Sequence, residues 1–332
     1  MKRLLKVIDV ATVFVTVVLL LMSIEIPVSG GAQAPESSPT VNSVPAIHTP
    51  WGDPDLQGMW SSSALVTVPF ERPRELGPRA VLTEDELTAR NIAAATRVRP
   101  KTNPPTGWAE SRPAPAQASL VTDPENGRLP PMTKEGVRRS HEWRTKAEPT
   151  YAYAGPEDLR PYDRCITRGV LGSTFPNIYS SAMWILQSPG FVVIHHEMIH
   201  ETRVIPLDGR PYISTDIHQW LGDSRGRWEG DTLVVETKNF NGLTGSHARN
   251  GNGNPTSKFL KLIERFRLDD TNTLSYEVRV EDPQTWTRAW TVAFPLISDR
   301  SHVFFEYACH EANYALANIL SGVRAAERRF KP

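Results

Sequence analysis

The feature that most constrains the fold is a succession of short segments after residue 178 in which polar and apolar residues alternate. Alternation with a period of two places successive side chains on opposite faces of a β-strand. We therefore predict strands at 182–188, 191–197, 202–208, 217–224, 232–240, 258–268, 273–282, 285–296 and 302–311. The links between these segments are short and contain turn-forming pairs such as Pro189-Gly190 and Asp208-Gly209.

These segments follow one another without an intervening helical pattern, so neighbouring strands should pair antiparallel. A sheet of so many strands curls, and closure into a barrel removes its exposed edges. We predict a mainly β fold whose core is an antiparallel closed barrel of the lipocalin type. A two-sheet sandwich is the alternative.

Proline separates the regular part of the chain from the rest, because most of the 28 prolines lie between residues 35 and 161. We predict a flexible linker at 35–50 and an irregular segment at 51–177 that wraps the outside of the barrel. The barrel and a C-terminal helix then occupy 178–332, and 51–332 form one structural unit.

Three helices are expected outside the barrel. Thr83 and Glu86 have the spacing of a capping box, which predicts a helix over 84–97. A second helix is expected at 133–146 and a closing helix within 312–329. Short strands are expected within 56–68 and 120–133.

The N-terminus has the composition of a secretion signal. Three positive charges in the first six residues precede an apolar run at 10–24. That run is shorter than the roughly 20 residues needed to span a bilayer, and Ala-Gln-Ala at 32–34 fits a cleavage site. We predict a signal peptide at 1–34 and a periplasmic or secreted mature protein without a membrane span; an uncleaved anchor is the alternative.

The charge balance and the cysteines narrow the classes of partner and compartment. Lys plus Arg and Asp plus Glu both number 37, so nothing indicates nucleic acid as a partner. A small molecule is the expected ligand or substrate. In an exported protein Cys165 and Cys309 predict one disulfide, with two buried thiols as the alternative.

His196, Glu197 and His200 have the spacing H-E-x-x-H, which on a helix is the signature of a zinc hydrolase. The β-branched flanks favour a hairpin instead. The two histidines then diverge, and Glu197 is expected to meet Arg203 across the hairpin. No cofactor is predicted. The alternative is a divalent metal held by histidines of different strands, from among His195, His196, His200, His218, His247 and His310.

We expect catalysis at the corner that this hairpin forms. Glu197 and His200 are the candidates for proton transfer, and Arg203 would orient them or hold a substrate oxygen. The predicted disulfide would bring four more polar residues to the same place: Asp163, Arg164, His310 and Glu311. A structural ion pair and a structural polar network are the competing interpretations.

Two sets of aromatic and polar residues are candidate ligand contacts. Trp286, Arg288 and Trp290 share one face of the predicted strand 285–296, which predicts a cation–π site. The alternative is an apolar outer face along which the arginine lies. A second set, His218 and Trp220, shares a face of the predicted strand 217–224.

The leading functional hypothesis is an exported barrel enzyme that acts on a small organic molecule by side-chain acid/base chemistry, as a lyase, isomerase or hydrolase. A non-catalytic binding protein of the lipocalin type is the alternative, and the zinc hydrolase is the third. Charged residues that converge in a pocket would favour the enzyme. A lining of only apolar and aromatic residues would favour the binding protein.

Five long blocks of the sequence are specific enough to compare with known families. They are 50-PWGDPDLQGMW-60, 197-EMIHETRVIPLDGRP-211, 222-GDSRGRWEGDTLVVETKNF-240, 281-EDPQTWTRAWT-291 and 307-YACHEANY-314. Together they resemble a large family of exported bacterial proteins of unassigned function, over nearly all of the chain after the linker. The resemblance implies export and does not imply an activity, a cofactor or a catalytic residue.

Overall fold

The structure is a computed structural model, and it describes residues 48–97, 114–146, 153–246, 253–300 and 302–330. The chain divides into two compact units, Met1–Ser43 and Val44–Pro332, and every described residue belongs to the second. The predicted signal peptide, almost all of the predicted linker and His247 therefore lie outside the described residues.

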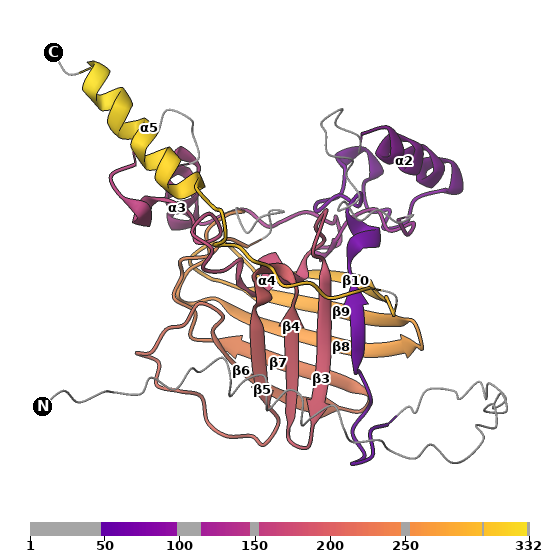
Figure 1. Cartoon of the computed structure of the whole chain (residues 1–332). Coiled ribbons are helices and arrows are strands. Elements are labelled where there is room, and N and C mark those ends of the chain that lie inside the picture. Colours follow the sequence, from indigo (N-terminus) through magenta and orange to yellow (C-terminus); the bar gives the residue numbers. More distant parts are fainter. Residues whose placement is uncertain (1–47, 98–113, 147–152, 247–252, 301, 331–332) are drawn as a thin grey trace, which may run out of the picture. The chain divides into compact units, whose positions relative to one another are not determined.

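Among the described residues, ten strands form one antiparallel sheet that is nearly closed into a barrel (Figure 1). The strands follow the order β5-β4-β3-β1-β10-β9-β8-β7-β6, and β2 pairs with β10 beside this path. Their bounds are β1 Gly58–Ser61, β2 Val121–Asp123, β3 Ala182–Ser188, β4 Phe191–His196, β5 Thr202–Pro206, β6 Asp223–Glu229, β7 Thr232–Lys238, β8 Lys261–Asp270, β9 Thr273–Glu281 and β10 Trp290–Ser298. The prediction of a mainly β fold built on an antiparallel barrel is confirmed.

Most of the strands expected from alternation are present. β3 has the predicted bounds, and β4, β5, β7, β8 and β9 lie within the predicted segments or close to them. In β4 and β9 buried residues alternate with more exposed ones along the strand. This burial pattern is the physical origin of the alternation in the sequence.

The predicted strand 217–224 is wrong. β6 begins only at Asp223, because the chain turns at Gly222, whose φ of +69° lies in the left-handed region that favours glycine. β6 itself buries the small residues Ser224 and Gly226 in place of large apolar ones, so its sequence lacks the expected pattern.

Two further strand predictions need correction. The segment 285–296 becomes a strand only at Trp290, because the backbone N–H groups of Thr285 and Trp286 donate to the Asp282 carbonyl in a turn. The segment 302–311 contains no strand. Its residues 302–309 are an extended stretch, called the arm below.

The irregular first half of the chain contributes strands to the barrel sheet. β1 lies between β3 and β10, where Trp60 pairs with Met183 on one side and with Ser298 on the other. β2 pairs with the opposite end of β10, and Val121 lies across from Val292. The two short strands thus share one edge of β10.

The helices are α2 Glu84–Arg97, α3 Lys134–Thr145, α4 Gly169–Thr174 and α5 Ala315–Phe330, with short 3-10 turns η1 Ser63–Leu65, η2 Arg74–Leu76, η3 Pro156–Asp158 and η4 Met198–His200. The predicted capping box is present, since the Thr83 N–H donates to Glu86 at 2.9 Å and the Glu86 N–H to Thr83 at 3.3 Å. None of the described helices is long and apolar enough to cross a membrane.

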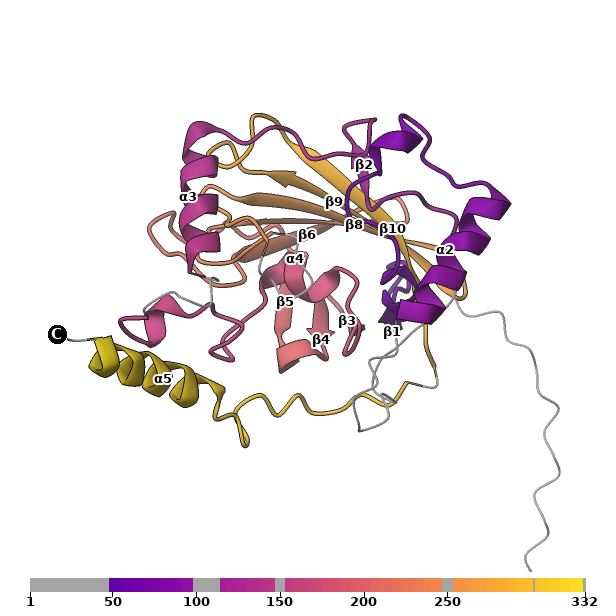
Figure 2. The ribbon, with the colours of Figure 1, turned by 90° about the horizontal axis from the view of Figure 1, so that it is seen from above.

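The sequence does not predict α4, whose six residues are all buried. Its Val170 and Leu171 belong to the hydrophobic core of the barrel. Figure 2 shows α4 between α2 and α3, which lie on opposite sides of the fold. α4 therefore joins the irregular segment to the barrel core and positions the residues on either side of it.

The gap between β5 and β6, where the sheet closes, leaves no room for a side chain at Gly226. A Cβ there would lie 2.6 Å from Leu207 Cδ2 and 2.9 Å from Cγ2 of the buried Ile205. We expect Gly226→Ala to lower the free energy of unfolding by about 1–3 kcal/mol, measured by urea denaturation. The matched control is Gly322→Ala in α5, where a Cβ meets nothing within 4 Å. Equal stabilities of the two variants would contradict the prediction.

Candidate functional site

The predicted pair of Glu197 and Arg203 is wrong. Arg203, in β5, is 5% exposed and forms a bidentate ion pair with Glu264 of β8, with N–O distances of 2.5 and 2.9 Å. The Tyr276 hydroxyl donates to the same carboxylate at 3.1 Å. Arg203 alternates with exposed neighbours along β5 and so points into the barrel, where the pair is sealed and structural.

The H-E-x-x-H segment is a hairpin, as the β-branched flanks predict, and the helical zinc site is wrong. β4 ends at His196, and η4 follows with Ile199 at φ 55° and His200 at φ 44°. His196 is 2% exposed whereas His200 is exposed, so the two imidazoles diverge. Within the described residues, no cluster of three or more His, Cys, Asp or Glu side chains is arranged to hold a metal ion.

Glu197 anchors the arm. Its Oε2 lies 2.9 Å from His302 Nε2, and its Oε1 accepts a hydrogen bond from the Phe305 N–H at 3.2 Å. The Phe304 ring packs beside His195 of β4, with ring centroids 5.0 Å apart. With only 4% of its surface exposed, Glu197 holds the extended chain against β4.

The expected convergence of Glu197 with Arg164, His310 and Glu311 is also wrong. His310 and Glu311 are both exposed, beyond the end of the arm. Arg164 lines a different cleft, beside α3. Glu197 is occupied by the first half of the arm, so the four side chains form no common site.

The predicted cation–π site is wrong as well. Trp286 and Trp290 are core residues, 2% and 0% exposed, with ring centroids 5.3 Å apart in an edge-to-face contact. Arg288 is exposed and donates to Asp123 at 2.6 Å. The expected common face does not exist, because the residues before Trp290 form a turn. Of the other pair, His218 is exposed and Trp220 is half-buried in the cleft beside α3.

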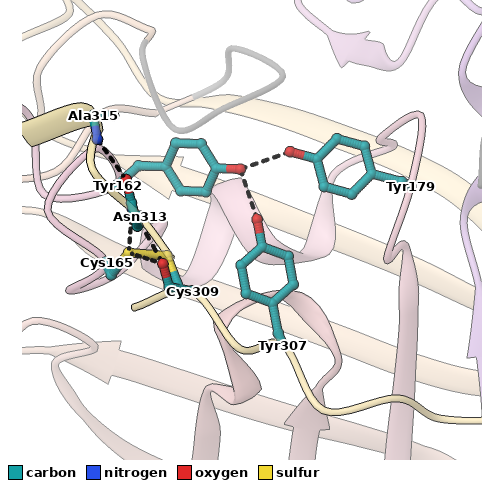
Figure 3. Close-up of a disulfide and its surroundings, with 7 residues drawn as sticks. All are labelled: Tyr162, Cys165, Tyr179, Tyr307, Cys309, Asn313 and Ala315. Carbon is teal, nitrogen blue, oxygen red and sulfur yellow. Dashed lines mark hydrogen bonds between the residues drawn. A yellow bond between two sulfur atoms is a disulfide. The ribbon is translucent and has the colours of Figure 1, made fainter. Parts of the chain in front are cut away.

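The disulfide between Cys165 and Cys309 is confirmed and fixes the second end of the arm (Figure 3). The Asn313 side chain donates to the Cys309 carbonyl at 3.1 Å and accepts from the Ala315 N–H at the start of α5, also at 3.1 Å. The bridge therefore joins the arm, the beginning of α5 and the segment that precedes α4.

Three tyrosines meet next to this disulfide. Figure 3 shows the Tyr162 hydroxyl between those of Tyr179 and Tyr307, at 2.7 and 3.0 Å. Sequence reasoning missed this cluster. Two of its members could have been predicted from the disulfide. Tyr162 lies three residues before Cys165, and Tyr307 lies two residues before Cys309.

The environment of this cluster keeps the Tyr162 and Tyr307 phenols protonated. Burial raises the pKa of Tyr162 well above its usual range, and its hydrogen bonds to the other two phenols act in the same direction. Burial also raises the pKa of Tyr307. The Arg168 guanidinium lies 5.0 Å from the Tyr162 ring centroid and donates to Asn177 at 3.1 Å. The phenols are therefore hydrogen-bond donors at neutral pH.

Glu201 connects this cluster to the barrel. It accepts hydrogen bonds from the Thr167 hydroxyl, from the Ser173 hydroxyl at 2.5 Å and from the Arg168 N–H at 3.2 Å. Burial raises the pKa of Glu201, and these donors offset part of the effect. The network holds both ends of α4 against the β4–β5 turn. It thereby fixes the Arg168 backbone and keeps its guanidinium beside the Tyr162 ring.

A cleft of about 500 Å³ opens beside the tyrosines, called the tyrosine cleft below. Its lining is Tyr162, Asp163, Glu306, Tyr307, Ala308, Cys309, Asn313, Ala315 and Ile319. Asp163 remains accessible to solvent, yet the protein atoms around its carboxyl raise its pKa, an effect that nearby Arg160 partly offsets. Neutral phenols and a carboxylate of increased basicity thus face one cavity.

His196 gives the fold a specific sensitivity to acid. Burial, and then the positive charge of Arg203, lower its pKa from 6.5 to about 3. The unfolded chain binds a proton that the folded protein excludes, so stability is fully present above pH 6.5 and is lost as the pH falls toward 3. We expect the free energy of unfolding to fall by about 2 kcal/mol between pH 7 and pH 5 from this residue alone.

Urea denaturation at several pH values measures how steeply the free energy of unfolding changes with pH in the wild type and in His196→Leu. The variant removes the titration, so its stability should change less over this interval, whatever its absolute value. An unchanged slope in His196→Leu would exclude His196 as the cause.

No protein-family model and no curated protein matches the sequence.

Proposed function

We propose that the protein is an enzyme that acts on a small organic molecule by general acid/base chemistry in the tyrosine cleft. The observation that carries the proposal is the combination in one cavity of hydrogen-bonded neutral phenols and the Asp163 carboxylate, whose pKa is raised. Groups whose environments shift their pKa values cluster at catalytic sites. Structural ion pairs such as Arg203 with Glu264 do not face a cavity in this way.

The chemistry that suits these groups is proton abstraction next to a carbonyl. Asp163 takes the proton from carbon, and the negative charge develops on the carbonyl oxygen. The hydrogen bond between the Tyr162 and Tyr307 phenols uses the proton of one of them, so the other phenol donates to that oxygen and is already oriented by its neighbour. Return of the proton to another carbon gives isomerisation, and loss of a leaving group gives elimination.

Exchange of carbon-bound hydrogen in D₂O tests this proposal without knowledge of the natural substrate. A panel of small ketones and keto acids is followed by NMR with the purified protein. We expect enzyme-dependent exchange for at least one compound, and a reduction of about 10²–10⁴-fold in Asp163→Asn and in Tyr162→Phe.

The matched controls remove the same groups elsewhere: Tyr212→Phe, whose phenol bonds Glu236, and the exposed Asp231→Asn. Both should retain full exchange. Exchange by no compound of the panel, or undiminished exchange in Asp163→Asn, would overturn the proposal.

We also infer that the protein is exported, and that it belongs to the exported family its sequence blocks resemble. The Cys165–Cys309 bridge supports export, because structural disulfides persist in oxidising compartments. N-terminal sequencing of the protein from the cell envelope or medium should find a chain that starts near residue 35. A chain that retains Met1 would contradict cleavage.

A further inference from the structure

We propose that a second cleft, beside α3, binds a small aromatic carboxylate. This cleft, called the tryptophan cleft below, has a volume of about 270 Å³, and its main lining residues are Trp143, Leu159, Arg160, Arg164, Trp220 and Leu243. It lies on the other side of the 160–164 segment from the tyrosine cleft, since Arg160 and Arg164 line one and Tyr162 and Asp163 the other. The proposal does not depend on the chemistry of the tyrosine cleft.

The size and the apolar part of the lining suit one planar ring. Small-molecule sites commonly have volumes of roughly 300–1,000 Å³, so this cleft lies at the small end. Trp143 comes from α3 and Trp220 from the segment before β6, and both are half-buried. Leu159 and Leu243 complete an apolar and aromatic surface of the kind that binds flat rings.

The charges of the lining favour an anion. Two of its acidic residues are already paired: Asp158 with Lys146 at 2.8 Å, and Glu142 with Arg138 at 2.5 Å. The third, Glu157, is exposed.

Within the described part of the chain, Arg160 and Arg164 form no ion pair, although both are half-buried. The Arg160 guanidinium instead lies 5.7 Å from the Trp143 ring centroid. A partly desolvated guanidinium binds a carboxylate through two parallel hydrogen bonds, so these two arginines are the expected contacts for the acid group.

A further polar atom of the cleft residues lacks a partner. The Trp143 Nε1–H is buried and has no acceptor among the described residues. Buried donors of this kind are normally satisfied, by protein, water or ligand. The two arginines, rather than this donor, indicate the class of ligand. An uncharged sugar would leave both guanidinium groups without an anion, so a carboxylate fits the lining better.

Isothermal titration calorimetry of the purified protein with benzoate tests the proposal, with benzamide as the uncharged isostere and acetate as the anion without a ring. We expect benzoate to bind at least about tenfold more tightly than either comparison compound. Arg160→Gln and Arg164→Gln should each weaken benzoate at least about tenfold and leave benzamide unchanged. The control is Arg227→Gln, an exposed arginine of β6 that pairs with Glu229.

Thermal melts of each variant show that it is folded, and Trp220→Phe provides a second test that leaves the arginines intact. This variant should weaken benzoate and benzamide alike, because it changes the ring contact and not the charge. The proposal is overturned if benzoate does not bind, if benzamide binds as tightly, or if both arginine variants retain wild-type affinity.

Discussion

Arg203→Ala lowers the free energy of unfolding by about 3–5 kcal/mol, because it leaves a charged carboxylate inside the barrel without its partner. The side chains of Arg203 and Glu264 are 4% and 0% exposed, so water cannot replace the lost guanidinium. Among the residues that the structure describes, only the Tyr276 hydroxyl then still donates to the Glu264 carboxylate, at 3.1 Å. Urea denaturation at neutral pH measures the effect.

The double variant Arg203→Met, Glu264→Leu separates the cost of an unpaired charge from the value of the pair. It removes both charges and keeps the interior filled, so it should recover most of the lost stability. An exposed pair provides the contrast: Arg227→Ala, which breaks the contact with Glu229, should change stability far less than Arg203→Ala, because water screens that pair. A loss below about 1 kcal/mol in Arg203→Ala would show that water reaches the pair.

The alternation of polar and apolar residues predicts the barrel because it reflects which side chains of each strand are buried. β3, β4, β5, β7, β8 and β9 each present one face to the core, and that alternation is visible in the sequence. The alternation does not predict β6, because the residues that β6 buries, Ser224 and Gly226, are not large and apolar. The arm is the opposite case. Its polar and apolar residues alternate as in a strand, because Phe304 packs on β4, yet its backbone joins no sheet.

Local alternation does not predict contacts between side chains that are far apart in the sequence. The register of the β4–β5 hairpin shows which way Arg203 points, but its partner Glu264 is 61 residues away in β8. The disulfide could be predicted because the chain has two cysteines, which allow one pairing. It also locates Tyr162 and Tyr307, whereas Tyr179 has no comparable marker. The individual aromatic residues of a barrel sequence do not reveal whether they fill the core or line a cleft, as Trp286 and Trp220 illustrate.

Removing the disulfide, by Cys165→Ser with Cys309→Ser, should lower the free energy of unfolding by about 4–5 kcal/mol. The bridge joins residues 144 apart, and releasing so long a loop greatly increases the conformational freedom of the unfolded chain. Urea denaturation of the variant, compared with the wild type with and without reductant, measures the loss. Agreement between the reduced wild type and the double serine variant shows that the bond itself is responsible.

The same variant tests whether the arm completes the tyrosine cleft. Without the bridge the arm keeps its first anchor, Glu197 to His302, but loses the covalent tie two residues after Tyr307. Tyr307 should then become mobile, and hydrogen exchange of the arm amides should rise while that of β8 and β9 stays slow. If the cleft is catalytic, its proton-exchange activity falls even where the barrel remains folded, because one phenol is no longer held beside Tyr162. Slow amide exchange in the arm, or a stability loss below about 2 kcal/mol, would mean that Glu197 and the packing of Phe304 hold the arm on their own.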